Sequence, residues 1–145
     1  MISKTHTNLS FVLDCSVTMT WCFEDESTAY TEKVLASLVD HTAKVPPLWP
    51  VEVSNVLLLA TRKQRISIIT AGQFKNALTT LPIQVDHQAT QRVFDTVFTL
   101  AQELHLTAYD ATYLELAQRE QIPLASLDKQ LIQAAKKISI PLFNL

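Results

Sequence analysis

The strongest constraint on the fold of this chain is a repeated pattern in which a short apolar run stops at an acidic residue and a helical stretch follows. The run Leu9–Leu13 (LSFVL) is β-branched and aromatic, and it stops at Asp14. A second run, Leu124–Leu127, stops at Asp128 in the same way. Continuous apolar runs of this length predict strands buried on both faces, as in a parallel sheet.

The rest of the chain shows the helical and extended patterns that such a sheet requires. Apolar residues at helical spacing predict a helix over Ser27–Asp40, and Pro50 suits the first turn of a helix that runs to Lys63. Lys44–Pro47 is predicted to be only briefly extended, because neither of its prolines can donate to a sheet. The other predicted elements are a helix capped by Thr70 that ends at Leu78, a strand Ile83–Val85, a long buried helix Gln88–His105 with Phe94 and Phe98 on its apolar stripe, a helix Asp110–Glu120 capped by Thr107, a helix Lys129–Lys137 and a strand Ile140–Phe143.

Strands that alternate with helices predict an α/β fold of three layers (αβα) with a mostly parallel central sheet. The chain has 145 residues, of which 48% are hydrophobic, and this suits one domain with a well-filled core. We therefore expect a single domain over residues 1–145, with residues 1–8 as a flexible N-terminal segment.

The composition excludes several classes of function. Gly72 is the only glycine, so the chain can form neither a glycine-rich dinucleotide loop nor a P-loop. A formal charge of −2 argues against nucleic-acid binding through bulk basicity, so any such contact must be local. The two cysteines, Cys15 and Cys22, have no zinc-ligand spacing. Without a signal-peptide or membrane-spanning pattern, we expect a cytoplasmic protein that makes no membrane contact.

Four acidic residues are embedded in apolar sequence, unlike most of the 14 acids of the chain. Asp14 and Asp128 end predicted strands, whereas Glu52 and Asp110 lie in the first turns of predicted helices. In a parallel sheet these places share one edge, where α/β folds keep their ligand crevice. Carboxylates gathered there repel one another, and oxygen ligands without histidine or cysteine favour Mg²⁺ or Mn²⁺. Such an ion activates water and offsets charge on a phosphodiester.

Taken singly, each of these acids also has a purely structural explanation. Asp110 follows Thr107 by three residues, much as in a capping box, and Asp128 suits an ordinary N-cap. Glu52 in a first turn is favoured by the helix dipole. It is the set of four acids at matching places in the topology that favours a metal site.

Beyond these four acids, the sequence resembles a known family, the PIN-domain ribonucleases, and among them the VapC-type toxins of bacterial and archaeal toxin–antitoxin pairs. The resemblance covers Leu9–Leu145. The segments that carry it, in the order of the family, are Val12–Val17 (VLDCSV), Pro47–Leu57 (PLWPVEVSNVL), Leu106–Leu114 (LTAYDATYL) and Pro123–Asp128 (PLASLD).

The resemblance implies an endoribonuclease that depends on Mg²⁺ or Mn²⁺ and cleaves RNA with an activated water. By that likeness Asp14, Asp110 and Asp128 contact the ion directly or through water, and Glu52 either binds the ion or polarises the attacking water. The family likeness also implies a homodimer and inhibition by a cognate antitoxin whose C-terminal segment lies across the site.

Other residues are expected to orient the acids. The resemblance assigns Ser16 and Asn55 to a hydrogen-bonding shell, and Thr107 and Ser126 are further candidates, although their cap and strand positions explain them nearly as well. Ser126 stands where the family more often has threonine, and Ser139 stands where a glycine commonly ends the last helix. The first departure keeps a hydroxyl and the second concerns a helix cap.

The densest cationic cluster is a candidate track for RNA phosphates. It consists of Arg62, Lys63 and Arg65, at the end of the helix that carries Glu52. A solvated helix terminus with a favourable dipole explains the same cluster equally well.

Two other functions stay open from the sequence. An aspartyl-phosphate phosphatase would use Asp14 as its nucleophile, but that chemistry usually wants a second acid two residues later, where this chain has Ser16. A catalytically silent PIN-like domain would serve only as a binding or regulatory module, and the complete set of four acids argues against it.

Overall fold

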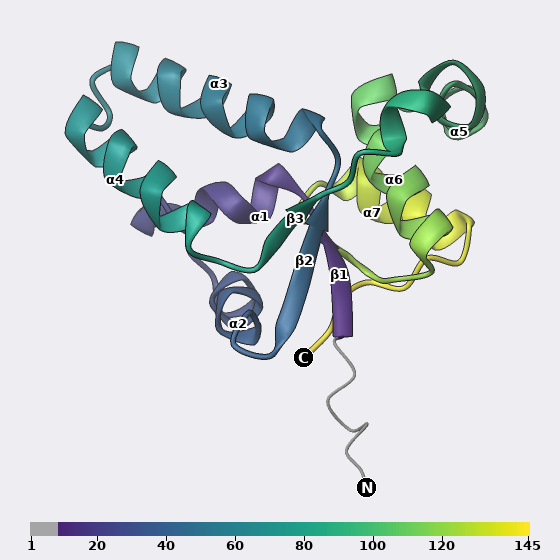
Figure 1. Cartoon of the computed structure of the whole chain (residues 1–145), viewed down its shortest axis with the longest axis horizontal. Helices are drawn as coiled ribbons and strands as arrows, with labels where there is room; N and C mark the ends of the chain where they lie inside the picture. Colours follow the sequence, from purple (N-terminus) through teal and green to yellow (C-terminus); the bar gives the residue numbers. More distant parts are fainter. Residues whose placement is uncertain (1–8) are drawn as a thin grey trace, which may run out of the picture.

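The computed structural model describes residues 9–145, so the segment 1–8, predicted to be flexible, lies outside the described residues. A four-stranded, wholly parallel sheet has the strand order β3–β2–β1–β4. Figure 1 shows α1 to α4 on one side of this sheet and α5 to α7 on the other, which confirms the predicted three-layer αβα fold. The strands are β1 (Leu9–Leu13), β2 (His41–Val45), β3 (Ile83–Val85) and β4 (Leu124–Ala125).

The helices are of moderate length, and none in the described part of the chain is long and apolar enough to cross a membrane. They are α1 (Cys15–Thr20), α2 (Ala29–Ser37), α3 (Leu48–Arg62), α4 (Ile68–Thr79), α5 (Phe98–Leu104), α6 (Ala108–Glu120) and α7 (Lys129–Lys137), with the 3-10 turns η2 (Glu24–Glu26) and η3 (Ala89–Arg92) and the π-turn η4 (Val93–Val97).

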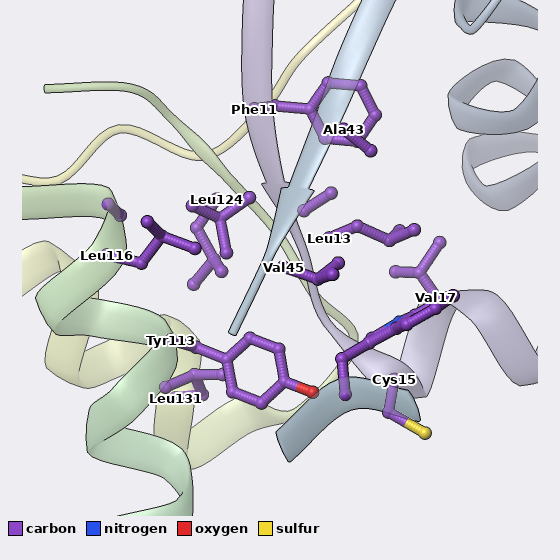
Figure 2. Close-up of a cluster of buried hydrophobic side chains, with 14 of the residues drawn as sticks. Phe11, Leu13, Cys15, Val17, Ala43, Val45, Tyr113, Leu116, Leu124 and Leu131 are labelled. Carbon is purple, nitrogen blue, oxygen red and sulfur yellow. The ribbon is translucent and has the colours of Figure 1, made fainter. Parts of the chain in front are cut away.

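The core is built around β1, the strand that pairs with β2 on one side and β4 on the other. Phe11, Val12 and Leu13 have no exposed surface, as expected for an apolar run covered by helices on both faces. Figure 2 shows how the strands and the helices α6 and α7 contribute to this core, through Leu13, Val45, Leu124, Tyr113, Leu116 and Leu131.

Several predicted boundaries are confirmed. The strands β1 and β3 and the helix α7 have the predicted bounds. Thr107 caps α6, because its hydroxyl accepts a hydrogen bond from the backbone N–H of Asp110 at 3.1 Å. The helix α3 begins at Leu48, two residues before the predicted start, and α2 is shorter at both ends than the predicted Ser27–Asp40.

The middle of the chain contains elements that the sequence did not predict. Lys44–Pro47 was expected to be only a brief extended piece, but β2 covers His41–Val45 and pairs with both β1 and β3. The strand ends immediately before the prolines, so their missing N–H groups interrupt no ladder. The short helix α1 was not predicted at all, because its six residues (CSVTMT) are too few to show a helical period.

The predicted long buried helix Gln88–His105 is wrong. That stretch is divided into η3, η4 and α5, and the side chains of Phe94 and Phe98 are 97% and 59% exposed. A π-turn has more residues per turn than an α-helix, so the apolar stripe drawn at α-helical spacing does not stay on one face.

Three element ends also differ from the prediction. The helix α4 is capped by Ser67 rather than by Thr70, whose N–H donates to the Ser67 hydroxyl at 3.0 Å. The strand predicted over Leu124–Leu127 ends at Ala125, and the strand predicted over Ile140–Phe143 is reduced to one parallel bridge between Leu142 and Leu124. Beyond Ala125, the backbone bonds with side chains of the acidic edge instead of with a neighbouring strand.

Candidate functional site

The topology brings the four predicted acids to the edge of the sheet where the strands end. Asp14 follows β1 directly, and Asp128 follows β4 as the N-cap of α7. Glu52 is in the second turn of α3, the helix that follows β2, and Asp110 is in the first turn of α6. Carboxyl ends of parallel strands and the helix starts that follow them lie at one edge.

Asp14 is the most buried of the four, with 7% of its surface exposed. Burial raises the pKa of Asp14, hydrogen bonds from Ser16 and Ser126 lower it, and the charge of Asp128 raises it further, so that the net shift is upward. An ionised carboxylate at this place is therefore costly unless a cation compensates it.

Two serine hydroxyls hold Asp14 in one orientation. Ser16 Oγ and Ser126 Oγ donate to the same oxygen, Oδ2 of Asp14, at 2.6 and 2.7 Å. Each serine oxygen also accepts a backbone N–H at 3.0 Å, from Leu127 for Ser16 and from Asp128 for Ser126. Each hydroxyl gives its one proton to Asp14, so its oxygen is left to accept the backbone N–H. These bonds hold the Asp14 carboxylate together with the ends of β1 and β4. Ser16 and Ser126 thus lie where an orienting role requires them.

Glu52 is half-buried and is held by a residue that the sequence analysis missed. The hydroxyl of Tyr113 donates to Oε1 of Glu52. Burial raises the pKa of Glu52, the Tyr113 hydrogen bond lowers it, and the charges of Asp14 and Asp110 raise it, again with a net upward shift. A signal was available: Tyr113 lies in an apolar stretch three residues after Asp110, and a buried tyrosine hydroxyl needs a partner.

Asp110 and Asp128 lie at the predicted helix starts and also close enough to the other acids for their charges to interact. Burial raises the pKa of Asp110, and so do the charges of Asp128 and Asp14, while Thr107 lowers it by a hydrogen bond. Asp128 caps α7 through a single oxygen, Oδ1, which accepts from the N–H groups of Gln130 and Leu131 at 2.9 and 3.3 Å. Asp128 therefore caps α7 and still belongs to the acidic cluster, because its charge raises the pKa of both Asp110 and Asp14.

Among the residues that the structure describes, no basic side chain compensates the four acids. Within residues 9–145, none of them forms an ion pair with a lysine, arginine or histidine. The contrast is Glu115 of α6, which is 1% exposed but bonds with Arg119 at 2.9 Å. Structural buried acids are paired in this way, so the unpaired set at the sheet edge calls for an external cation.

The donor set fits a hydrated magnesium or manganese ion. It offers carboxylate and hydroxyl oxygens, while the buried thiol of Cys15 has a pKa raised to about 12 by burial and by the charges of Glu52 and Asp14. As they stand, no three acidic, histidine or cysteine side chains of residues 9–145 form a group that encloses an ion. Mg²⁺ keeps several of its waters and takes only one or two protein carboxylates directly, so this wider arrangement suits contact partly through water.

The other predicted residues form no side-chain hydrogen bond or ion pair with the four acids within residues 9–145. The side chain of Asn55 is exposed one turn after Glu52 and forms no hydrogen bond within the described residues. Arg65 pairs with Asp25 and Glu26 at 3.1 and 2.9 Å and lies 3.9 Å above the Phe23 ring. Its charge is thus already engaged within the fold. The exposed side chains of Arg62 and Lys63 lie at the far end of α3, about 15 Å along the helix from Glu52.

Comparison with known proteins agrees with this geometry. The family model of the PIN domain matches residues 11–137. The crystal structure of PAE2754 from Pyrobaculum aerophilum is similar with a TM-score of 0.66 at 21% identity, over 88% of this chain and 87% of that one. VapBC2 from Rickettsia felis, solved with a DNA fragment from its promoter, has a TM-score of 0.66 at 11% identity, over 94% and 98%. These structures share the fold, and no curated protein matches the sequence.

Proposed function

The chain belongs to the PIN domain family, whose members are in general nucleases, and we propose that it is a Mg²⁺- or Mn²⁺-dependent endoribonuclease that acts as the toxin of a toxin–antitoxin pair. The observation that carries this proposal is a set of four acids at one sheet edge without a cation partner in residues 9–145. Burial and the neighbouring acids raise the pKa of three of them, Asp14, Glu52 and Asp110. A bound ion would supply the activation of water and the stabilisation of charge on the phosphodiester.

The residues of the chain contribute orientation and charge to this reaction. Asp14, held by Ser16 and Ser126, is the fixed acid around which the site is arranged. Asp110 and Asp128 complete the negative surface that would hold the ion, each anchored at the start of a helix. Glu52 either joins them as a ligand or accepts the proton of the attacking water, a role that its raised pKa favours.

An RNA substrate is supported by the family resemblance and by local charge. The four acids repel a phosphodiester until an ion is present, so RNA binding and metal binding are expected to depend on each other. Arg62 and Lys63 remain candidate phosphate contacts at a distance from the acids, whereas Arg65 would first have to leave Asp25 and Glu26.

We further propose that a cognate antitoxin protein covers the acidic edge and that the protein works in the cytoplasm, where RNA and newly made antitoxin are both available. The support for the partner is the similarity to VapBC2, which was solved with promoter DNA. An apolar hollow of about 350 Å³ is lined in part by Leu48, Val93 and Tyr109, the residue that precedes Asp110, and offers a place for apolar contact with such a partner. Co-purification of the protein with the product of a neighbouring small reading frame would support this part of the proposal.

A homodimer is also part of the proposal. Phe94 and Phe98 are four residues apart and strongly exposed. The side chains of Leu58 and Leu59, on α3, are exposed to 46% and 43%. Exposed apolar groups in such number favour contact with a second copy of the chain. Light scattering should give the mass of a dimer for the wild-type protein and of a monomer for Phe94→Ser if η4 is the contact.

The decisive experiment compares the cleavage of RNA by wild-type protein and by Asp14→Asn. Wild-type protein should cleave with Mg²⁺ or Mn²⁺ and stop in EDTA, and Asp14→Asn should be slower by more than about 100-fold, since it removes the central carboxylate. Asp95→Asn, the same change at an exposed acid of η4, should cleave like wild type. Undiminished cleavage by Asp14→Asn would refute the nuclease proposal, and a folded wild type without metal binding in calorimetry would favour the silent binding module.

A further inference from the structure

We propose that Tyr113 is a positioning residue of the acidic site: its hydroxyl holds one oxygen of Glu52, so that the carboxylate stays beside Asp14 and Asp110 and strengthens metal binding. This inference rests on the proposed function and adds to it a residue that neither the sequence motifs nor the family match assigns. It concerns affinity for the ion, which can be measured separately from cleavage.

The first support is the place of Tyr113 in the fold. The residue is 1% exposed and is the largest fully buried side chain of the described residues. Figure 2 shows its ring inside the core near Leu131, with the hydroxyl pointing away from α6 and towards the side where Cys15 lies. Figure 1 shows α6 and α3 leading to opposite sides of the sheet, so the Tyr113–Glu52 bond connects the two sides at the acidic edge.

The second support is the situation of Glu52. Its bond with Tyr113 is the one side-chain hydrogen bond that Glu52 makes within residues 9–145, and it uses Oε1 alone. Asp14 and Asp110 repel the ionised Glu52, as their effect on it shows. A glutamate has several rotatable bonds, so without a tether this repulsion would turn the carboxylate towards solvent. The tyrosine hydroxyl opposes that movement and leaves Oε2 for the shared site.

A purely structural explanation of the same contact makes a different prediction. A buried tyrosine needs an acceptor for its hydroxyl, and any acceptor serves that purpose. If that were the whole role, Tyr113→Phe would cost only stability, as the loss of any buried hydrogen bond does. Positioning instead predicts that the ring without its hydroxyl folds normally but binds the ion more weakly.

The experiment is a calorimetric titration of Mn²⁺ into three proteins, well below the melting temperature of the least stable one. Tyr113→Phe should weaken Mn²⁺ binding by about 10-fold, the lower end of the effect of removing a group that orients a metal ligand. The matched control is Tyr30→Phe, which also removes one hydroxyl bond, to the carbonyl oxygen of Phe143 at 2.8 Å, away from the acids. Tyr30→Phe should bind Mn²⁺ like wild type even if it loses as much stability.

A double-mutant cycle with Glu52→Gln identifies the partner. Because Tyr113 is inferred to act only through Glu52, Tyr113→Phe should weaken Mn²⁺ binding in the wild-type background and have no further effect in the Glu52→Gln background. In RNA cleavage, Tyr113→Phe should need about 10-fold more Mn²⁺ for half-maximal rate.

Each outcome of these titrations decides between the alternatives. Wild-type affinity in Tyr113→Phe, or an equal loss in Tyr30→Phe, overturns the positioning role and leaves the nuclease proposal intact. Additive effects of the two substitutions in the cycle would likewise show that Tyr113 does not act through Glu52. A wild-type protein that binds no Mn²⁺ overturns both the proposed function and this inference.

Discussion

At the residue scale, the orientation of the acids depends on hydroxyl groups that donate hydrogen bonds to their carboxylates. Ser16 and Ser126 each give their only proton to Oδ2 of Asp14 and accept a backbone N–H in return. The Tyr113 hydroxyl similarly donates to Glu52. Two of the four acids are thus oriented by neutral donors, which fix a carboxylate without neutralising it. An acid set oriented in this way keeps its charge for an external ion.

Substitutions at Ser126 should separate its hydroxyl from its position in the chain. Ser126→Ala removes one donor to Asp14 and an acceptor for the Asp128 N–H, and we expect Mn²⁺ affinity to fall by about 10-fold. Ser126→Thr keeps the hydroxyl and should bind like wild type. Calorimetric titration of both variants is the measurement. Equal affinity in Ser126→Ala and wild type would exclude the orienting role.

At the element scale, the scarcity of glycine means that other residues adopt the left-handed conformation at the ends of the helices. From Leu9 to Leu145, four non-glycine residues adopt the left-handed conformation, with φ between 56° and 62°: Gln64, His105, Gln121 and Ser139. All four directly follow the end of a helix or its cap, where glycine is the usual residue. Each side chain there has a steric cost that glycine avoids.

Ser139→Gly should therefore stabilise the protein. Ser139 has φ 62° just after α7, and replacing it by glycine should raise the free energy of unfolding by about 1 kcal/mol. Lys136→Gly, inside the last turn of the same helix, should instead lower it by about 1 kcal/mol. Urea unfolding of the two variants and the wild type gives both values, and destabilisation by Ser139→Gly would contradict the steric explanation.

At the scale of the whole molecule, the acidic edge makes stability depend on pH and metal together. The pKa values of Asp14, Glu52 and Asp110 are raised by burial above their ordinary values. Groups with raised pKa values bind more protons in the folded than in the unfolded state. Their contribution to stability is complete below the ordinary carboxyl range and is lost as the pH rises through the raised values.

The melting temperature should report this linkage. Without metal, it should fall as the pH rises from acidic values through the range of these three acids. Mg²⁺ should raise the melting temperature more at neutral than at acidic pH, because protons and the ion compete for the same carboxylates. In Asp110→Asn both effects should be smaller. A Mg²⁺ effect of the same size at every pH would contradict the assignment of these acids to a metal site.

The sequence alone determined most of the framework, because strands buried on both faces and helix caps leave local signals. The bounds of β1, β3 and α7, the Thr107 cap and the parallel αβα architecture follow from the apolar runs and capping residues. It also selected the four acids, since a charged side chain within apolar sequence is itself a local anomaly.

The tertiary structure decided what depends on contacts between distant segments. β2 is a strand because β1 and β3 flank it, and the exposure of Phe94 follows from a π-turn that no periodicity reveals. The bonds from Ser126 to Asp14 and from Tyr113 to Glu52 join residues 112 and 61 positions apart in the chain. These bonds form only because whole elements pack against one another. A local residue pattern does not show which distant segments come into contact.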